Sequence, residues 1–385
     1  MVDSTSGLIG IEPVINASGT LTTLGGNRLS KTVIQAINEA SSNFYDMNEL
    51  HLKAGKFLAS LIDCESAYIT NGVGAGIVLT VAASRCHNDI TKASKLPCTT
   101  DLPNEVVIQK LHYNQYAPIV KAAGAEIVLA GNEAATTKTD LENEINEKTA
   151  CILYFAYDPQ LGVLNLDNCI EIAHSKGLPL IIDASAETFP QTRIRSLVHS
   201  GADAVLFSLG KDVAGPNDTG VIFGKKEIVD FCRRIGPHGY ITPGYQYIGR
   251  PLKLSKEDIF GAITAFIEYM QVDPIRRMSE FDEMVTEIEE NLEEINIFKT
   301  RIIHPDVDDP HLKHHRPDTI PRIKIYDFLS PLNSEYFYHK LLEGSPKIYT
   351  YTIGDSLFIN PQCLTRNEMK QVLQRIFEIV KELKP

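Results

Sequence analysis

The sequence lacks the hydrophobic segments that place a protein in or across a membrane. A transmembrane helix needs about 18 or more consecutive apolar residues, and no such run occurs among the 385 residues. The first ten residues are polar and do not show the basic and then apolar pattern of a secretory signal. We therefore expect a cytoplasmic protein that has no membrane partner.

Cysteine motifs and an excess of basic residues are also missing. The 7 cysteines are scattered and form no C-x-x-C pair, which is typical of reduced thiols in a cytosolic protein. The 37 basic residues are outnumbered by 49 acidic ones, and the net charge is −12. Binding to a phosphate backbone needs clustered Lys and Arg, so this balance argues against nucleic-acid binding.

The composition is that of a globular enzyme-sized chain. A hydrophobic content of 43% allows a sizeable core and excludes a mainly disordered protein. The 25 glycines and 20 prolines show no period, which excludes a collagen-like repeat.

Continuous apolar strands alternate with helices through the first 250 residues. The expected strands are 66–70, 105–109, 126–130, 150–155, 178–182, 204–208 and 220–223. This alternation predicts an α/β fold with a mostly parallel sheet covered on both faces. Beyond about Pro251 we expect one or two long helices, with Ser255 as the cap of the first and, if there are two, a break near Pro274, followed by short strands and a closing helix.

The pattern predicts three parts of the chain. Residues 1–48 form an N-terminal arm and helix, and residues 49–250 form the large α/β domain. Residues 251–385 form a smaller C-terminal α+β domain.

A glycine-rich segment follows the first expected strand and opens a helix. It reads Thr70-Asn71-Gly72-Val73-Gly74-Ala75-Gly76. Glycines let backbone N–H groups crowd an anion, and a helix N-terminus adds a positive partial charge, so the segment suits a phosphate. Taken alone, it is equally typical of a tight strand–helix junction, because it lacks the lysine and hydroxyl residue of a P-loop.

An aspartate and a lysine follow two of the later strands. Asp183 ends an apolar run, at the position where open α/β sheets bind ligands, although an N-cap would look the same. Lys211 follows Gly210 after another apolar strand. A lysine at this position can be desolvated, which lowers its pKa and lets it form a Schiff base. Taken alone, however, a lysine after a strand is more often a solvated loop residue.

The three features together are more specific than each alone. Pyridoxal phosphate needs an anion site for its phosphate, a carboxylate for its pyridinium nitrogen and a lysine for its aldehyde. The glycine segment, Asp183 and Lys211 supply these groups on strand ends of one sheet.

Further motifs occur in the same order along the chain. They are Ile15-Asn16-Ala17-Ser18-Gly19-Thr20, Leu24-Gly25-Gly26, Leu96-Pro97 with Asn104-Glu105-Val106, Ile182-Asp183-Ala184-Ser185-Ala186-Glu187, Gly201-Ala202-Asp203, Gly210-Lys211 with Gly215-Pro216, and Gly249-Arg250-Pro251-Leu252-Lys253. With them the chain, from about Ile15 to its C-terminus, resembles fold-type I pyridoxal-phosphate enzymes. More narrowly, it is similar to the selenocysteine-synthase-like branch that includes the D-glucosaminate-6-phosphate ammonia-lyase group.

The resemblance implies roles for individual residues. Lys211 would carry the cofactor covalently and move protons at the substrate α-carbon, and Asp183 would pair with the pyridinium nitrogen. His112 would stack on the ring, Ser185 would touch its opposite face, and Ser208 would help the glycine backbone to hold the phosphate. The implied cofactor-binding residues are Gly72, Val73, Gly74, His112, Asp183, Ser185, Ser208 and Lys211.

The sequence departs from the family pattern at three places. Ser185 stands where relatives usually carry alanine, and Asn217 stands where they tend to carry glutamine. The segment Pro346-Lys347-Ile348-Tyr349-Thr350 lacks the arginine that holds the substrate carboxylate in many fold-type I enzymes. We expect Arg250 to replace that arginine.

Other substrate contacts are expected from less specific positions. Arg193 and Arg28 are further candidates for the carboxylate. Asn16 and the segment up to Gly26 are expected to line the site of a neighbouring subunit, because fold-type I sites usually draw residues from two subunits. The resemblance therefore implies a homodimer or a larger homo-oligomer.

The expected function is that of a pyridoxal-phosphate lyase acting on a small amino substrate. It would eliminate the β-hydroxyl group of a 2-amino-3-hydroxy acid, such as an amino sugar acid, as water, and hydrolysis would then release ammonia and leave a 2-oxo acid. Racemisation, aldol cleavage and β-replacement stay open, because they share the same first steps. A selenocysteine-synthase-like transferase is disfavoured, since that enzyme carries an extra N-terminal tRNA-binding domain and this chain starts almost at Asn16.

Two other classes of protein and a metal site are alternatives to the lyase. A non-catalytic protein of the same fold is disfavoured by the intact Lys211 and Asp183. A dinucleotide enzyme would need an acidic residue about 20 positions after the glycines, following a second strand, and this pattern is missing. The H-x-x-H-H cluster of His311, His314 and His315 is expected to be an exposed loop and not a metal site, as is the acidic turn 306–309.

Overall fold

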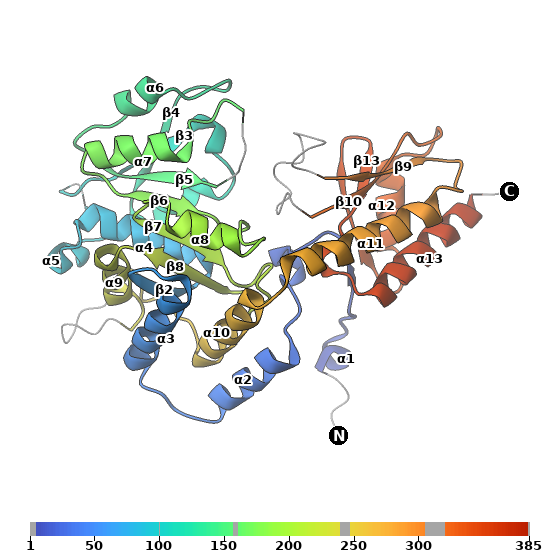
Figure 1. Cartoon of the computed structure of the whole chain (residues 1–385), viewed down its shortest axis with the longest axis horizontal. Helices are drawn as coiled ribbons and strands as arrows, with labels where there is room; N and C mark the ends of the chain where they lie inside the picture. The colour runs from blue at the N-terminus through green and yellow to red at the C-terminus, as the bar shows by residue number, and fades with distance from the viewer. Residues whose placement is uncertain (1–4, 100, 157–160, 239–246, 305–319, 384–385) are drawn as a thin grey trace. The chain divides into compact units, whose positions relative to one another are not determined.

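The computed structural model describes residues 5–99, 101–156, 161–238, 247–304 and 320–383. By contacts the chain divides into a larger unit, Asn27–Gln271, and a smaller unit, Met1–Gly26 with Val272–Pro385 (Figure 1). This contact division differs from the expected parts, since it groups the N-terminal segment with the C-terminal part and keeps residues 251–271 in the larger unit.

A seven-stranded sheet forms the centre of the larger unit. In sheet order its strands are β2 (Ser66–Asn71), β8 (Thr219–Gly224), β7 (Ala204–Ser208), β6 (Leu180–Asp183), β5 (Thr149–Phe155), β3 (Glu105–Gln109) and β4 (Glu126–Ala130). Neighbouring strands are parallel except for β8, which is antiparallel to both β2 and β7. Strands β5, β6 and β7 are buried along their whole length, as continuous apolar runs predict.

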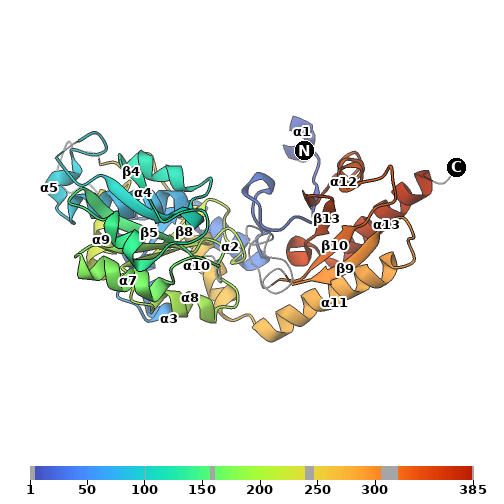
Figure 2. The ribbon, with the colours of Figure 1, turned by 90° about the horizontal axis from the view of Figure 1, so that it is seen from above.

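Helices cover both faces of this sheet (Figures 1 and 2). The helices of the larger unit are α2 (Lys31–Ser41), α3 (Met47–Ile62), α4 (Gly72–Cys86), α5 (Ile90–Ala93), α6 (Lys138–Asn143), α7 (Leu166–Ser175), α8 (Thr192–Val198), α9 (Lys226–Ile235) and α10 (Lys256–Met270), with 3-10 turns η2 (Lys110–His112) and η3 (Ala117–Ala123). One apolar cluster joins the sheet to α3, α7, α8 and α10, and a second joins its other face to α4, α9 and η3. The predicted α/β fold is thereby confirmed.

The smaller unit contains an antiparallel sheet and three longer helices. The sheet order is β12 (Tyr351–Ile353), β13 (Ser356–Ile359), β10 (Arg322–Tyr326) and β9 (Lys299–Ile303), and the helices are α11 (Pro274–Leu292), α12 (Ser334–Leu342) and α13 (Arg366–Glu382). The N-terminal segment contributes α1 (Thr5–Ile9) and the 3-10 turn η1 (Thr22–Leu24), and its strand β1 (Ile15–Asn16) pairs in parallel with β11 (Ile348–Tyr349). This pairing explains why the N-terminal 26 residues belong to the same unit as the C-terminal ones.

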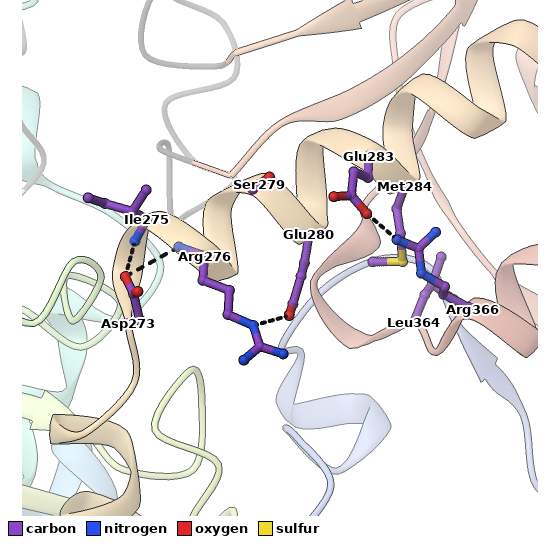
Figure 3. A pocket seen from close by; sticks show the side chains of 9 residues that line it. All are labelled: Asp273, Ile275, Arg276, Ser279, Glu280, Glu283, Met284, Leu364 and Arg366. Carbon is purple, nitrogen blue, oxygen red and sulfur yellow. Dashed lines mark hydrogen bonds and ion pairs between the residues drawn. The ribbon is translucent and has the colours of Figure 1, made fainter.

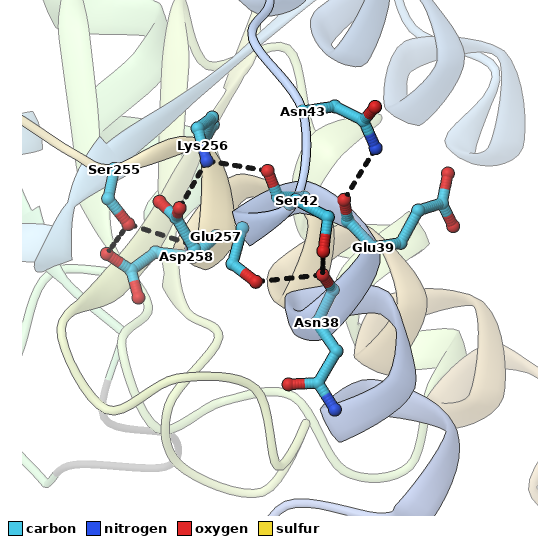
Figure 4. A network of polar contacts seen from close by, with 10 residues as sticks. Asn38, Glu39, Ser42, Asn43, Ser255, Lys256, Glu257 and Asp258 are labelled. Atoms are coloured by element: carbon cyan, nitrogen blue, oxygen red, sulfur yellow. Dashed lines mark hydrogen bonds and ion pairs between the residues drawn. The ribbon is translucent and has the colours of Figure 1, made fainter.

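Capping residues define two separate helices after Pro251. Ser255 precedes α10, and its Oγ accepts a hydrogen bond from the Asp258 backbone N–H at 3.1 Å. Pro274 occupies the first turn of α11, where its missing N–H costs nothing. Lys256 then ties the start of α10 to the end of α2, because its Nζ donates to the Ala40 carbonyl at 2.6 Å (Figure 4).

The expectations about membrane helices and metal ligands can be compared only with the described residues. No helix within the described ranges is long and apolar enough to span a membrane. Among the same residues, no three His, Cys, Asp or Glu side chains gather as metal ligands. The cluster His311, His314 and His315 and the turn 306–309 lie outside the described residues. All seven cysteines are free thiols.

Candidate functional site

The aspartate and the lysine predicted from the sequence lie on neighbouring strand ends. Asp183 is the last residue of β6 and pairs in register with Leu206 of β7, and Lys211 follows β7 by three residues. The Ser208 backbone N–H donates to the Ser185 carbonyl at 3.3 Å, so the two loops that follow these strands are in contact. The fold therefore brings Asp183, Ser185, Ser208 and Lys211 together at one edge of the sheet.

Asp183 is a buried carboxyl group and not a helix cap. Its side chain Oδ1 accepts the Ser185 backbone N–H at 2.9 Å, and the next helix, α8, begins only at Thr192. Burial raises the pKa of Asp183, while the hydrogen bonds from Ser185 and the charge of Lys211 oppose this rise. An ionised Asp183 is therefore held in place by the donor groups around it.

Lys211 is a half-buried amine, which excludes the solvated loop lysine as its setting. Burial lowers the pKa of Lys211, and the carboxylates of Asp183 and Glu187 partly restore it. The Lys211 carbonyl accepts from Ala214 N at 3.0 Å and from Asn27 Nδ2 at 3.2 Å, which fixes the backbone from which the amine extends.

The glycine segment forms the first turn of α4. The helix begins at Gly72, so Gly72, Val73 and Gly74 are helical. The side chain of the N-cap residue, Asn71, makes no capping bond and donates instead to the Lys253 carbonyl at 3.1 Å. The turn also approaches β8 closely, since a Cβ on Gly220 would lie 2.6 Å from the Gly72 carbonyl carbon.

The start of α4 lies at the same edge of the sheet as Asp183 and Lys211. Strands β2 and β7 are both antiparallel to β8, so they run in the same direction, and α4 follows the carboxyl end of β2 directly. Its first backbone N–H groups and its dipole favour an anion at this position. The structure thus combines an anion cradle, a carboxyl group and an amine.

His112 occupies the end of β3 at this edge, in the turn η2. Its ring is fully buried, lies 4.6 Å from the Tyr154 ring in an edge-on contact, and accepts the Phe155 N–H at Nδ1 over 3.4 Å. Burial lowers the pKa of His112 to about 3, so the ring is neutral at physiological pH. Its stacking on a cofactor stays a prediction.

The arginine candidates have different surroundings. Arg193 forms a 2.6 Å ion pair with the buried carboxylate of Glu187. Arg28 is exposed. Arg250 is half-buried within a basic neighbourhood, because Arg250 and Lys253 both act with burial to lower the pKa of His238. Of the three, Arg250 has the setting that best suits an anionic group.

Asn16 shapes its own chain segment. Its Nδ2 donates to the Gly19 carbonyl at 2.8 Å, and its Oδ1 accepts the Ser18 N–H at 3.0 Å. The side chain therefore folds the turn after β1 in the smaller unit, and a role at a neighbour's site stays a prediction.

The motif Gly201-Ala202-Asp203 lies at the opposite edge of the sheet. Asp203 Oδ2 accepts the Leu180 N–H at 2.8 Å and lies 2.9 Å from His174 Nε2, while Oδ1 lies 2.7 Å from Lys225 Nζ. This aspartate ties the starts of β6 and β7 to the end of β8. We therefore assign Asp203, the last residue of this motif, a structural role.

Sequence reasoning missed two residues that surround the lysine. In the sequence, Glu187 is only the last residue of the motif that begins at Ile182. In the structure, its buried carboxylate acts on the Lys211 amine. Asp212 follows Lys211 and accepts a hydrogen bond from the Tyr269 hydroxyl at 2.9 Å. The only available signal was their position near Asp183 and Lys211, since no sequence pattern shows that the Glu187 carboxylate acts on the Lys211 amine or that Asp212 bonds to Tyr269.

A groove of about 720 Å³ runs along α11 in the smaller unit (Figure 3). Its charged residues satisfy one another, because Arg276 pairs with Glu280 at 3.1 Å and Arg366 pairs with Glu283 at 2.5 Å. It contains none of the residues predicted to act on a substrate.

Comparison with known proteins agrees with this arrangement. The family model for aminotransferase class I and II matches residues 14–255. The chain is 35% identical to a D-glucosaminate-6-phosphate ammonia lyase of Salmonella typhimurium over 68% of this chain and 69% of that protein. It is 31% identical to a 5'-C-glycyluridine monooxygenase-decarboxylase of a Streptomyces species over 77% of this chain and 73% of that protein.

More distant sequences and a solved structure extend the comparison. An L-seryl-tRNA(Sec) selenium transferase of Aquifex aeolicus is 25% identical over 58% of this chain and 53% of that protein. The solved structure of a D-glucosaminate-6-phosphate ammonia-lyase superposes with a TM-score of 0.83 at 28% identity, covering 99% of both chains. The chain therefore belongs to the aminotransferase class I and II family of fold-type I enzymes, whose membership implies pyridoxal phosphate.

Proposed function

We propose that this protein is a pyridoxal-phosphate lyase that eliminates water from a 2-amino-3-hydroxy acid, such as an amino sugar acid, and then releases ammonia by hydrolysis to give a 2-oxo acid. The observation that carries the proposal is the placement of Lys211, Asp183 and the start of α4 at one edge of the sheet. The 35% identity to an ammonia lyase that acts on an amino sugar acid phosphate supports the substrate class.

The residues fit the cofactor at each of its three polar ends. The backbone N–H groups of Gly72, Val73 and Gly74, with the Ser208 hydroxyl, would hold the phosphate. Asp183 would pair with the ring nitrogen, and Lys211 would bind the aldehyde. The buried carboxyl and the half-buried amine already influence each other's pKa, as such an arrangement requires.

Two further residues would contact the cofactor ring. His112 is neutral because of its burial, and an uncharged imidazole can pack against the ring without repelling the pyridinium. Ser185 would lie on the opposite face, where its hydrogen bonds also favour the ionised form of Asp183. Both contacts depend on the loops that follow β3 and β6.

The chemistry would rest on proton transfer by Lys211. The bound cofactor supplies an electron sink for the charge that develops at the substrate α-carbon. Once the substrate amine replaces it at the aldehyde, the Lys211 amine would take the α-proton, and its burial favours the neutral form that a base requires. The same amine then returns a proton when the β-hydroxyl group leaves or when the product is released.

Arg250 is the residue that we assign to the substrate carboxylate. Arg193 is engaged with Glu187, and Arg28 is exposed, so Arg250 alone combines partial burial with a basic neighbourhood. Replacing Arg250 with methionine should raise KM about 100-fold, since it removes a charge-assisted bond of about 3 kcal/mol. An unchanged KM for the substrate would contradict this assignment.

The first experiment is to record the visible absorbance of the purified protein beside that of Lys211→Ala. A yellow protein whose band is lost or altered in the variant would establish the cofactor and its lysine. A panel of amino acids and amino sugar acids would follow, with 2-oxo acid release as the readout. Release from a single compound would name the reaction.

The outcomes separate the competing functions. A spectral change without 2-oxo acid release would favour racemisation, cleavage or β-replacement. A colourless protein that gains no band with added pyridoxal phosphate would overturn the proposal. The homodimer or larger oligomer belongs to the same proposal, and sedimentation of the purified protein tests it.

A further inference from the structure

The lysine loop is anchored to helix α10 through a residue outside the proposed cofactor set. Asp212, the residue after Lys211, is 3% exposed, and its Oδ2 accepts the hydroxyl hydrogen of Tyr269 at 2.9 Å. Tyr269 is equally buried and lies in the last turn of α10. The main chain that carries the amine is therefore bonded at its next residue to a separate element.

The same tyrosine is linked to the loop that follows Asp183. The Tyr269 carbonyl accepts a hydrogen bond from Gln191 Nε2 at 2.9 Å, and Gln191 is 7% exposed. Gln191 ends the loop that begins at Asp183 and immediately precedes α8. One residue of α10 thus joins the loop of the carboxyl group to the loop of the amine.

Close packing holds the lysine loop against the same helix. A Cβ on Gly215 would lie 3.0 Å from the Leu209 carbonyl oxygen and 3.4 Å from Ala265 Cβ of α10. A Cβ on Gly261 of α10 would lie 2.8 Å from Pro216 Cγ. The loop and α10 therefore approach each other at two glycines, which leaves little room for the loop to move away from its hydrogen bonds.

Helix α10 is itself fixed at its other end. Ser255 caps its first turn, and Lys256 Nζ donates to the Ala40 carbonyl at the end of α2 (Figure 4). The Ser30 hydroxyl, which caps the start of α2, donates to Glu268 Oε2 of α10 at 2.7 Å. A helix that is anchored at both ends holds the groups bonded to its last turn in fixed positions.

We infer that Asp212 and Tyr269 are positioning residues that set where the Lys211 amine lies relative to Asp183. This inference rests on the proposed role of Lys211. A displacement of about 1 Å in a reacting group can lower a rate about 100-fold, so an anchor of this kind has a measurable effect. Asp212 and Tyr269 act through the backbone and contact no reacting atom in this assignment.

The test removes the hydrogen bond and follows the amine directly. In Tyr269→Phe, the looser loop should expose the Lys211 amine to water, and its pKa should rise by about one unit toward the value of about 10.4 of a free lysine. Lys211 can be titrated in the cofactor-free protein by NMR after isotopic labelling of lysine, with Lys211→Arg to assign the signal. This readout does not require activity of the loaded enzyme.

Three companion variants separate positioning from a general loss of stability. Asp212→Asn keeps an acceptor oxygen for the Tyr269 hydroxyl and should restore most of the parent behaviour, whereas Asp212→Leu should resemble Tyr269→Phe. Ser66→Ala removes a hydroxyl-to-aspartate bond of the same 2.9 Å length, from Ser66 to Asp230, at the opposite edge of the sheet. That control should leave the Lys211 titration unchanged.

With pyridoxal phosphate bound, Tyr269→Phe and Asp212→Leu should lower kcat about 10- to 100-fold and change KM less than about threefold. Unchanged Lys211 titration and unchanged kcat in Tyr269→Phe and Asp212→Leu would overturn the inference. If the parent protein binds no pyridoxal phosphate, the proposed function fails, but the NMR titration still decides whether Tyr269 positions the amine.

Discussion

Asp183 ends β6, Lys211 follows the adjacent parallel strand β7 by three residues, and the two side chains influence each other's ionisation. The carboxyl group favours the protonated amine, and the amine favours the ionised carboxyl group, while burial acts against both charges. Each group therefore helps the other to stay charged in this buried site. A bound pyridinium nitrogen would supply Asp183 with a second cationic partner.

We expect Asp183→Asn to weaken pyridoxal-phosphate binding and to lower kcat by about 100-fold or more. The amide cannot supply the negative charge, and a charge-assisted hydrogen bond of about 3 kcal/mol corresponds to about two powers of ten. Titration of the protein with cofactor at its visible band measures the affinity. The exposed Asp167 offers a control, and parent-like affinity in Asp183→Asn would refute the assigned pairing.

Local patterns in the sequence predicted most strands and helices of the larger unit. Strands β3, β4 and β7 have the predicted bounds, because an apolar run is a pattern of a few neighbouring residues. The strand-end positions of Asp183 and Lys211 follow from the same patterns, since parallel strands place their carboxyl ends at one edge.

Contacts that depend on how separate elements pack could not be predicted from these local patterns. Strand β9 was not predicted, because its residues Lys299–Ile303 alternate in exposure and include two basic side chains. The pairing of β1 with β11 joins segments more than 330 residues apart. Nothing in the local sequence indicates that Arg193 pairs with Glu187 or that Tyr269 reaches Asp212, since each bond depends on how loops and helices pack.

The buried ion pair of Arg193 and Glu187 should contribute to stability more than to substrate binding. Arg193→Met leaves the Glu187 carboxylate buried without this partner, so we expect the free energy of unfolding to fall by about 3 kcal/mol. Urea unfolding at pH 7.5 measures this loss. Arg28→Met, at an exposed site, is the matched control and should change stability by less than about 0.5 kcal/mol.

A double variant tests the physical reason. Adding Glu187→Gln to Arg193→Met removes the buried charge and should recover part of the lost stability. If Arg193→Met is as stable as the parent but raises KM strongly, Arg193 binds substrate and the structural assignment is wrong.

Arg85 should be the most sensitive arginine of the larger unit to substitution. Its side chain is fully buried and donates to the carbonyl oxygens of residues 97, 99, 103 and 123, at distances between 2.5 and 3.1 Å. Arg85→Met removes all of these bonds and should cost about 3 to 5 kcal/mol of unfolding free energy. Arg366→Met, which breaks only exposed ion pairs with Glu283 and Glu287, should cost less than about 1 kcal/mol.

Thermal or urea unfolding of both arginine variants gives the comparison. Arg85→Lys should recover little, because an ammonium group cannot span carbonyls that the planar guanidinium reaches together. Equal losses in Arg85→Met and Arg366→Met would show that the loop carbonyls do not depend on Arg85.

His51 should make the fold sensitive to acid. The side chain is 2% exposed, and neither ring nitrogen has a hydrogen-bond partner among the described residues. Burial, followed by the nearby His238 and Arg233, lowers the pKa of His51 to about 3. Because the folded state binds this proton less tightly than the unfolded state, the stability contributed by the neutral ring is complete above about pH 6.5 and is lost as the pH falls toward 3.

We therefore expect His51→Leu to reduce the loss of stability on acidification. Between pH 7.5 and pH 5 the neutral ring costs the parent about 2 kcal/mol, since each pH unit below about 6.5 corresponds to about 1.4 kcal/mol. Urea unfolding at the two pH values should show a correspondingly smaller difference in His51→Leu. The same substitution at His339 should leave the parent difference unchanged, because that side chain is 67% exposed in the folded protein. An identical difference in parent and His51→Leu would mean that the His51 ring gains a proton or a partner in the folded protein and is not held neutral by burial.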